Sequence, residues 1–189
     1  MSGEAQLWLI RHAPVDGPRG VLHDHDAPAN LGDAIALGAL RGRLPANAMS
    51  YCSPSRRTVE TAQALGLAAT KEPAFREQSF GAWTGRRHKE IEAELGADAY
   101  REFWRAPATN RPPGGESFAD QITRVAAGLK ALPAGDVMLV VHSGTIRSAL
   151  AIALGISPES ALRFVIDPLS LTRIDRLNND WRIVAVNRR

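Results

Sequence analysis

Cysteine is almost absent from this 189-residue chain, in which Cys52 is the only one. A single cysteine cannot close an internal disulfide, and it cannot build a metal site of the kind that several thiolates form together. Long apolar runs are missing as well, because no stretch approaches the ~20 residues that span a bilayer. The N-terminus lacks a basic segment followed by an apolar one. We therefore expect a cytoplasmic protein without membrane association, built as one domain over residues 1–189.

Lysine is also scarce, since only Lys71, Lys89 and Lys130 stand among 23 basic residues and the rest are arginine. The arginines are scattered along the chain rather than clustered with aromatic residues, which argues against a nucleic-acid partner. The planar arginine side chain binds phosphate or carboxylate through two parallel hydrogen bonds. The composition therefore suits a small anionic ligand, and nothing in it indicates an oligomeric state.

The first informative feature of the sequence is a predicted buried strand that is followed by two polar residues. Leu7 to Ile10 is wholly apolar and too short for a helix, so it predicts a strand covered on both faces. Arg11 and His12 follow at once, and Pro14 prevents simple continuation of the strand. Ligands of open α/β sheets bind at the carboxyl ends of the strands. Arg11 and His12 are therefore candidate site residues.

The same strand-to-helix arrangement recurs twice, which predicts an α/β fold. A strand at 49–52 leads to a helix at 56–65 that begins with Arg56 and Arg57, and a strand at 137–141 leads through His142 to a helix at 145–154. We expect a three-layer α/β/α sandwich with a mostly parallel central sheet. Further helices are expected at 31–44 (capped by Asn30), 87–95, 97–104 and from Ser117 to about 132, and further strands at 68–72, 163–166, 171–176 and 181–186, the last ones antiparallel.

Histidines and arginines that converge on one sheet edge favour phosphoryl chemistry. A neutral imidazole can attack phosphorus and so divide a hydrolysis into formation and breakdown of a phosphoenzyme. Arginines would neutralise the charge that spreads over the phosphoryl oxygens. The leaving alkoxide needs a proton, for which Glu77 is the preferred donor, with Glu60 and Glu116 as alternatives. We expect Glu116 instead to cap or orient the helix that begins near Ser117.

Five short motifs carry a resemblance. They are Leu9-Ile10-Arg11-His12-Ala13, Ser53-Pro54-Ser55-Arg56-Arg57-Thr58-Val59-Glu60-Thr61-Ala62, Phe75-Arg76-Glu77-Gln78-Ser79-Phe80-Gly81-Ala82-Trp83-Thr84-Gly85, Gly114-Gly115-Glu116-Ser117 and Val140-Val141-His142-Ser143-Gly144-Thr145-Ile146-Arg147. In this order they resemble the signatures of the histidine phosphatase superfamily, the phosphoglycerate mutase-like proteins. The resemblance covers the chain from Leu7 to about Leu150, and beyond that only the general pattern is similar.

The resemblance implies a fold and a mechanism. It implies the phosphoglycerate mutase-like sandwich, with His12 as the phosphorylated nucleophile and Glu77 as general acid and base. It further implies that Arg11, Arg57 and His142 hold the phosphoryl group and that neither a metal nor another cofactor is required. The expected activity is that of a phosphatase acting on a small-molecule phosphate ester.

The loop from Pro14 to Asn30 bears on the substrate. Its pattern is most similar to small bacterial phosphatases that include alpha-ribazole phosphatase, which makes alpha-ribazole 5′-phosphate the specific candidate. His23-Asp24-His25-Asp26 nevertheless replaces their Tyr-Gly-x-x-Asp pattern. His23 and Trp83 are candidate substrate contacts. A metal site in this loop is disfavoured, because neighbouring side chains of an extended loop point in alternating directions and no further ligand cluster exists.

Three other functions stay open at this stage. A phosphoglycerate mutase would transfer the phosphoryl group back to its substrate instead of to water, and it usually carries longer insertions around the site. A protein phosphohistidine phosphatase would have a shallow, open site. A phosphate-binding module without catalysis would bind phosphate but release none from any ester.

Overall fold

The computed structural model describes residues 3–178 and 180–189, and within them the chain forms a mixed six-stranded sheet in the order β3-β2-β4-β1-β5-β6. Its four neighbouring strands from β3 to β1 run parallel, β5 is antiparallel to β1, and β6 is antiparallel to β5. The predicted α/β fold with a mostly parallel sheet is confirmed. The strands are β1 (Ala5–Arg11), β2 (Met49–Cys52), β3 (Thr70–Lys71), β4 (Gly135–Val141), β5 (Leu171–Arg176) and β6 (Trp181–Arg188).

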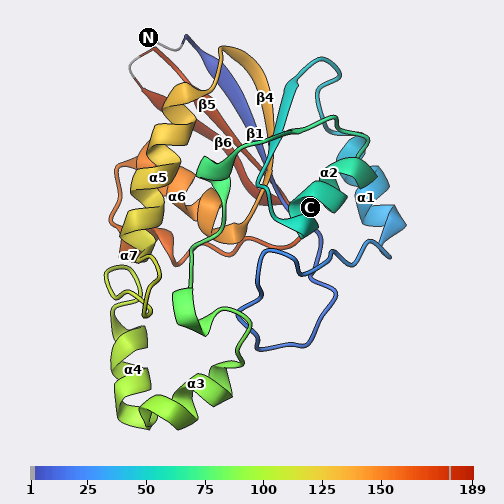
Figure 1. Cartoon of the computed structure of the whole chain (residues 1–189). Helices are drawn as coiled ribbons and strands as arrows, with labels where there is room; N and C mark the ends of the chain where they lie inside the picture. The colour runs from blue at the N-terminus through green and yellow to red at the C-terminus, as the bar shows by residue number, and fades with distance from the viewer. Residues whose placement is uncertain (1–2, 179) are drawn as a thin grey trace.

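Helices cover both faces of this sheet (Figure 1). One layer holds α5 and α6 with the short α7, the other holds α1 and α2, and α3 and α4 form an arm that projects from the lower end of the molecule. The helices are α1 (Ala34–Arg41), α2 (Arg56–Ala64), α3 (His88–Leu95), α4 (Ala97–Arg105), α5 (Phe118–Ala131), α6 (Ser143–Leu154) and α7 (Pro158–Ala161), with single 3₁₀ turns η1 (Pro73–Phe75) and η2 (Gly81–Trp83).

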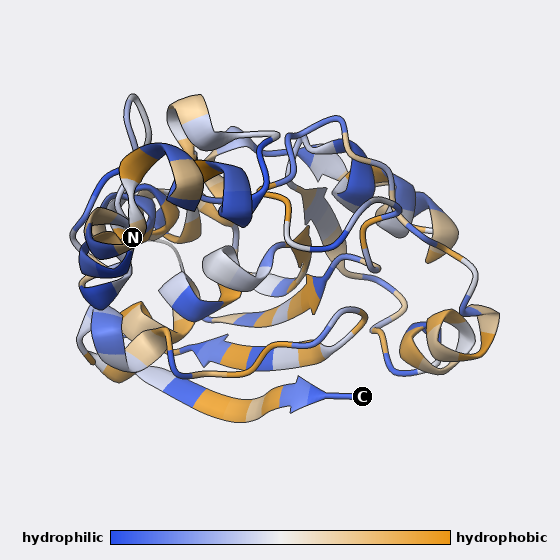
Figure 2. Ribbon diagram, turned by 90° about the horizontal axis from the view of Figure 1, so that it is seen from below, coloured by the Kyte–Doolittle hydropathy of each residue, from blue (hydrophilic) through white to orange (hydrophobic). Residues whose placement is uncertain are grey.

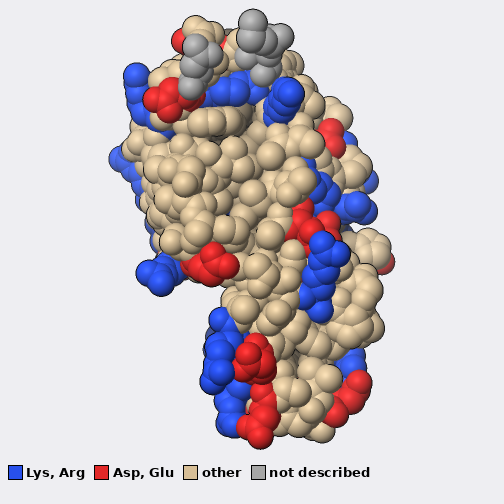
Figure 3. All heavy atoms as spheres, turned by 90° about the vertical axis from the view of Figure 1, so that its left-hand side faces the viewer, with Lys and Arg blue, Asp and Glu red and all other residues tan. Residues whose placement is uncertain are grey.

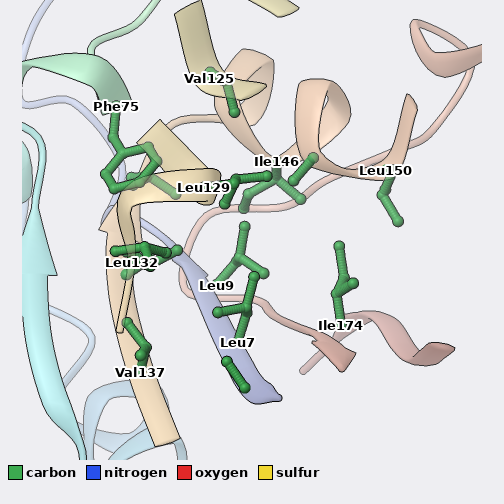
Figure 4. Close-up of a cluster of buried hydrophobic side chains, with 14 of the residues drawn as sticks. Leu7, Leu9, Phe75, Val125, Leu129, Leu132, Val137, Ile146, Leu150 and Ile174 are labelled. Carbon is green, nitrogen blue, oxygen red and sulfur yellow. The ribbon is translucent and has the colours of Figure 1, made fainter. Parts of the chain in front are cut away.

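The two central strands are apolar because both of their faces are covered. Leu7 and Leu9 of β1 pack with Ile146 of α6 and Val125 of α5 on one side (Figure 4). Ile10 belongs to a second cluster on the other side, which contains residues of α1 and α2. Full burial of an aliphatic side chain of this size contributes roughly 1.5–3 kcal/mol. The two clusters therefore fix β1 and β4 at the centre of the molecule.

The register of β1 and β4 positions the site. All seven residue pairs are matched, from Ala5 beside Gly135 to Arg11 beside Val141. The residues that follow, His12 and His142, consequently leave the sheet at the same level.

The outer strand β6 has apolar residues in its middle and hydrophilic ones at its ends, as Figure 2 shows.

Two predicted elements differ from the structure. The helix expected from residue 31 begins at Ala34, because the carboxylate of Asp33 accepts a hydrogen bond from the Ala36 amide and caps it, whereas the Asn30 side chain accepts from the Gly32 amide. The strand expected at 163–166 is absent from the described chain. There the carbonyls of Phe164 and Ile166 accept hydrogen bonds from arginine side chains instead of from a neighbouring strand.

The surface carries charges of both signs. On the face drawn in Figure 3, basic and acidic side chains alternate along the projecting arm, where Arg101 pairs with Asp98 and Arg105 with Glu102. Among the described residues no helix has the length and apolar character that crossing a bilayer requires.

Candidate active site

His12 follows β1 directly and is almost fully buried. Its Nδ1 lies 2.6 Å from the carbonyl oxygen of Ala13. A carbonyl can only accept, so Nδ1 carries the hydrogen and Nε2 keeps its lone pair. Burial lowers the pKa of His12 well below its ordinary value, and the positive charges of Arg57 and Arg11 act in the same direction. The ring is therefore neutral near pH 7, as a nucleophile must be.

His142 lies beside it, with ring centroids 5.1 Å apart and the planes inclined by 66°. Arg57 Nη2 approaches His142 Nδ1 at 3.4 Å, and His142 Nε2 lies 2.8 Å from Ser53 Oγ. Because a guanidinium only donates, Nδ1 is the acceptor and Nε2–H donates to the serine. Burial, followed by the charges of Arg57 and Arg11, holds the pKa of His142 well below its ordinary value. Both histidines are thus neutral.

Two predicted phosphate-binding arginines border this pair. Arg57 stands in the first turn of α2, almost fully buried, and donates from Nη1 to the Asp24 carbonyl at 2.6 Å. Arg11 ends β1 and donates from Nη1 to the Ile166 carbonyl at 2.5 Å, while its buried Nε has no partner in the described residues. Burial lowers the pKa of both, and the Glu77 carboxylate opposes that shift. Positive charge is therefore concentrated at the carboxyl end of β1.

Arg147 of α6 adds to this charge. Its Nε donates to the Phe164 carbonyl at 2.9 Å, and burial lowers its pKa while the Glu77 carboxylate raises it. Arg11 and Arg147 together secure the segment that the sequence had suggested as a strand, since they bind two of its carbonyls.

Glu77 is partly buried in the segment between η1 and η2. Its Oε1 accepts hydrogen bonds from the Gln121 side-chain amide at 3.0 Å and from the Gln78 backbone at 3.1 Å. Its Oε2 faces the Gly144 amide at 3.4 Å, in the first turn of α6. A Cβ at Gly144 would lie only 2.2 Å from Oε1. The carboxylate is thus held against the helix that follows His142.

A cavity of about 460 Å³ opens beside these groups. His23, one of the two predicted substrate contacts, lines it, and burial followed by the charge of Arg57 lowers the pKa of this histidine. Trp83, the other expected contact, lies elsewhere: it is buried against Phe103 of the arm, with ring centroids 4.6 Å apart. The lining residues are His23, Asp24, His25, Pro54, Ser55, Arg57, Arg76, Glu77, Gln78, Ser79, Phe80, Thr84, Glu116 and Arg124.

The alternative carboxylates have other partners. Glu60 accepts from the Arg56 side chain and from the Ala29 backbone, so it anchors the end of the loop from Pro14 to Asn30. Glu116 does not cap the helix at Ser117, because Asp120 closes that capping box. Instead Glu116 forms an ion pair with Arg124 of α5.

Sequence reasoning missed three contributors to the site, namely Ser53, Gln121 and Arg124. Ser53 belongs to one of the five motifs, but Gln121 and Arg124 stand in α5, outside all of them. Among the residues that the structure describes, no group of three or more histidine, cysteine, aspartate or glutamate side chains is arranged to hold a metal ion.

Comparison with known proteins identifies the family of this chain. The family model of the histidine phosphatase superfamily (branch 1) matches residues 7–189. The chain belongs to this superfamily. A curated relative, named probable phosphoglycerate mutase GpmB of Yersinia enterocolitica, is 30% identical over 93% of this chain and 87% of its own length.

Solved structures share the fold over nearly the whole chain. The mycobacterial glucosyl-3-phosphoglycerate phosphatase has a TM-score of 0.77 at 25% identity and covers 98% of this chain and 100% of its own. The alpha-ribazole phosphatase from Shigella flexneri has a TM-score of 0.83 at 23% identity, with 96% of each chain covered. The names of these three proteins include two phosphatases and a probable phosphoglycerate mutase.

Proposed function

We propose that the protein is a phosphomonoesterase that hydrolyses a small phosphorylated metabolite through a phosphohistidine at His12. One observation carries the proposal: His12 is buried and neutral, its Nδ1–H donates to the Ala13 carbonyl, and its Nε2 is unprotonated. The partly buried Arg11 at the end of β1 and the buried Arg57 in the first turn of α2 supply positive charge. Such charge stabilises a phosphoryl group in the transition state.

The proposed reaction has two steps. In the first, His12 Nε2 forms a bond to phosphorus, the bond from phosphorus to the ester oxygen breaks, and the protonated Glu77 carboxyl gives its proton to the leaving alkoxide. In the second, the Glu77 carboxylate removes a proton from water, whose oxygen attacks phosphorus and breaks the phosphorus–nitrogen bond. Inorganic phosphate leaves and Glu77 is protonated again. Arg11, Arg57 and His142 surround the phosphoryl group throughout.

The cavity gives the proposal its substrate class. Its volume of about 460 Å³ suits a small metabolite, and its lining is mostly polar and charged. The exposed Arg76 at this cavity is available for an anionic part of the substrate. Alpha-ribazole 5′-phosphate is the candidate from the loop pattern. A phosphoglycerate is the second, because the 30%-identical relative bears the name of a phosphoglycerate mutase.

Mutase activity is the second candidate function, supported by the same relative. The two activities share the first step and differ in the acceptor, which is water for a phosphatase and a hydroxyl group of the bound product for a mutase. A substrate with a labelled phosphoryl group therefore distinguishes the two activities. A phosphatase releases labelled inorganic phosphate, whereas a mutase transfers the labelled phosphoryl group to a hydroxyl on another carbon of the product.

The test combines a generic substrate with a metabolite panel. Purified protein is incubated with p-nitrophenyl phosphate in the presence of a chelator, beside His12→Ala and the control His88→Ala from the projecting arm. We expect chelator-resistant turnover and an acid-labile phosphoprotein for the wild type and the control, and neither for His12→Ala. A wild type that binds phosphate but turns over no ester of the panel would refute the phosphatase and leave a binding module.

A further inference from the structure

Glu77 lies in a segment without regular secondary structure, so its backbone lacks the hydrogen bonds of a helix or a strand. The side chain of Arg124 in α5 binds the backbone of this segment instead. Its Nη1 donates to the carbonyls of Ala74 and Arg76 at 2.9 and 3.1 Å, and its Nη2 faces the Glu77 carbonyl at 3.4 Å. The guanidinium thus spans the stretch that leads into the carboxylate.

Glu116 holds the same guanidinium from the other side. Arg124 Nε and Nη2 donate to Glu116 Oε1 and Oε2 at 2.9 and 2.8 Å, which is the bidentate arrangement of a strong pair. Glu116 Oε2 also accepts from the Ser79 amide at 3.0 Å, and the Glu116 carbonyl accepts from the Gln78 side chain at 2.7 Å. The pair therefore contacts the backbone on both sides of Glu77.

We propose that Glu116 and Arg124 form a positioning pair that sets the location of the Glu77 carboxyl group at the cavity. This inference rests on the proposed role of Glu77 as general acid. The pair acts through the backbone of residues 74–79.

Glu116 is unsuited to being the acid itself. Burial opposes ionisation of Glu116, but hydrogen bonds from Arg124 and Ser79 outweigh it and hold its pKa below the ordinary value. A carboxylate that is ionised in this way has no proton to give. Lysine cannot replace Arg124, because one ammonium group cannot bind both carboxylate oxygens in the fixed fork geometry and reach two carbonyls.

Two esters whose leaving groups differ in basicity distinguish loss of the general acid from general structural damage, because structural damage would lower the turnover of both. A nitrophenolate departs without a proton, whereas an alkoxide needs one from the acid. Turnover of p-nitrophenyl phosphate and of an alkyl phosphate is therefore measured for wild type, Glu77→Gln, Arg124→Gln, Arg124→Lys and Glu116→Gln. Arg111→Gln is the matched control, because Arg111 forms an exposed ion pair with the same helix α5 through Asp120.

We expect Glu77→Gln to lower kcat/KM for the alkyl ester, which reports phosphoryl transfer to His12, about 10²–10⁴-fold, the usual contribution of a general acid, and to lower kcat/KM for the nitrophenyl ester far less. Arg124→Gln and Glu116→Gln should show the same selectivity at about 10-fold or more, with KM little changed. Arg124→Lys should fall between Arg124→Gln and wild type, and Arg111→Gln should match wild type.

The outcomes separate the two proposals. Equal loss of kcat/KM for both esters in Glu77→Gln would refute the acid and with it the proposed mechanism. Selective loss in Glu77→Gln, but equal or no loss in folded Arg124→Gln and Glu116→Gln, would overturn the positioning pair alone. Glu116→Gln keeps the shape of the side chain and decides the matter if Arg124→Gln does not fold, as judged by thermal unfolding.

Discussion

Gly144→Ala is expected to displace the Glu77 carboxylate without unfolding the protein. Gly144 lies in the first turn of α6, and a Cβ there would stand 2.2 Å from Glu77 Oε1 and 2.7 Å from Gln121 Oε1. Both are ends of flexible side chains, so they can move. The backbone tolerates the change, because Gly144 is not among the residues with positive φ and alanine is favoured over glycine in a helix by up to about 1 kcal/mol.

The magnitude follows from these contacts. Overpacking costs about 1–3 kcal/mol, part of which the helix preference of alanine offsets, so the free energy of unfolding should fall only slightly. If Glu77 is the acid, its displacement should lower kcat/KM for an alkyl phosphate by up to about 10²–10⁴-fold. The kcat/KM for p-nitrophenyl phosphate should be much less affected.

The assay compares these two esters together with urea unfolding. Gly38→Ala is the matched control, since Gly38 also lies in a helix and a Cβ there would meet nothing within 4 Å. A Gly144→Ala protein with undiminished turnover of the alkyl ester would refute the reasoning, because its Glu77 would have moved without consequence.

Three further predictions concern stability, each measured by urea unfolding. Because burial lowers the pKa of His12 and His142, both histidines take up protons below about pH 6.5 in the unfolded chain but not in the native protein. The free energy of unfolding should therefore stay constant with respect to these groups above about pH 6.5 and fall below it by up to about 1.4 kcal/mol per pH unit for each histidine. A free energy of unfolding that does not change below about pH 6.5 would contradict the prediction. Gly115→Ala should cost about 1–3 kcal/mol, since its Cβ would lie 2.5 Å from the Ser79 carbonyl; unchanged stability would disprove that close approach. Ser53→Ala should cost about 1–3 kcal/mol by leaving the His142 Nε2–H unpaired, and Ser53→Thr should restore part of it.

The sheet and the strand-end residues were predictable because their signals are local. Residues 7–10 and 137–141 are apolar without interruption, which is typical of strands covered on both faces. Parallel strands end at one edge, so His12 and His142 had to meet once the two strands were neighbours. Their 5.1 Å separation follows from the pairing of Arg11 with Val141.

Other features depend on contacts that a local pattern does not contain. Trp83 is buried because Phe103 of the arm, twenty positions further along the chain, packs on it. The segment 163–166 has the composition of a strand, but Arg11 and Arg147 take two of its carbonyls. In both cases the deciding partner is distant in sequence, so tertiary contact overrides local preference.

The Gly-Gly-Glu-Ser motif shows how such a distant contact supports the candidate acid. Gly81 has φ of +53° and a Cβ there would lie 2.1 Å from the Pro113 carbonyl, so the two backbones touch. The Ala82 amide donates to that carbonyl at 2.9 Å, and the Glu116 amide donates to the Ser79 carbonyl at 2.8 Å. Side chains at Gly81 or Gly115 would separate the segments and withdraw Glu116 from Ser79. The close packing at Gly115 therefore brings the Glu116 carboxylate to the segment that carries Glu77.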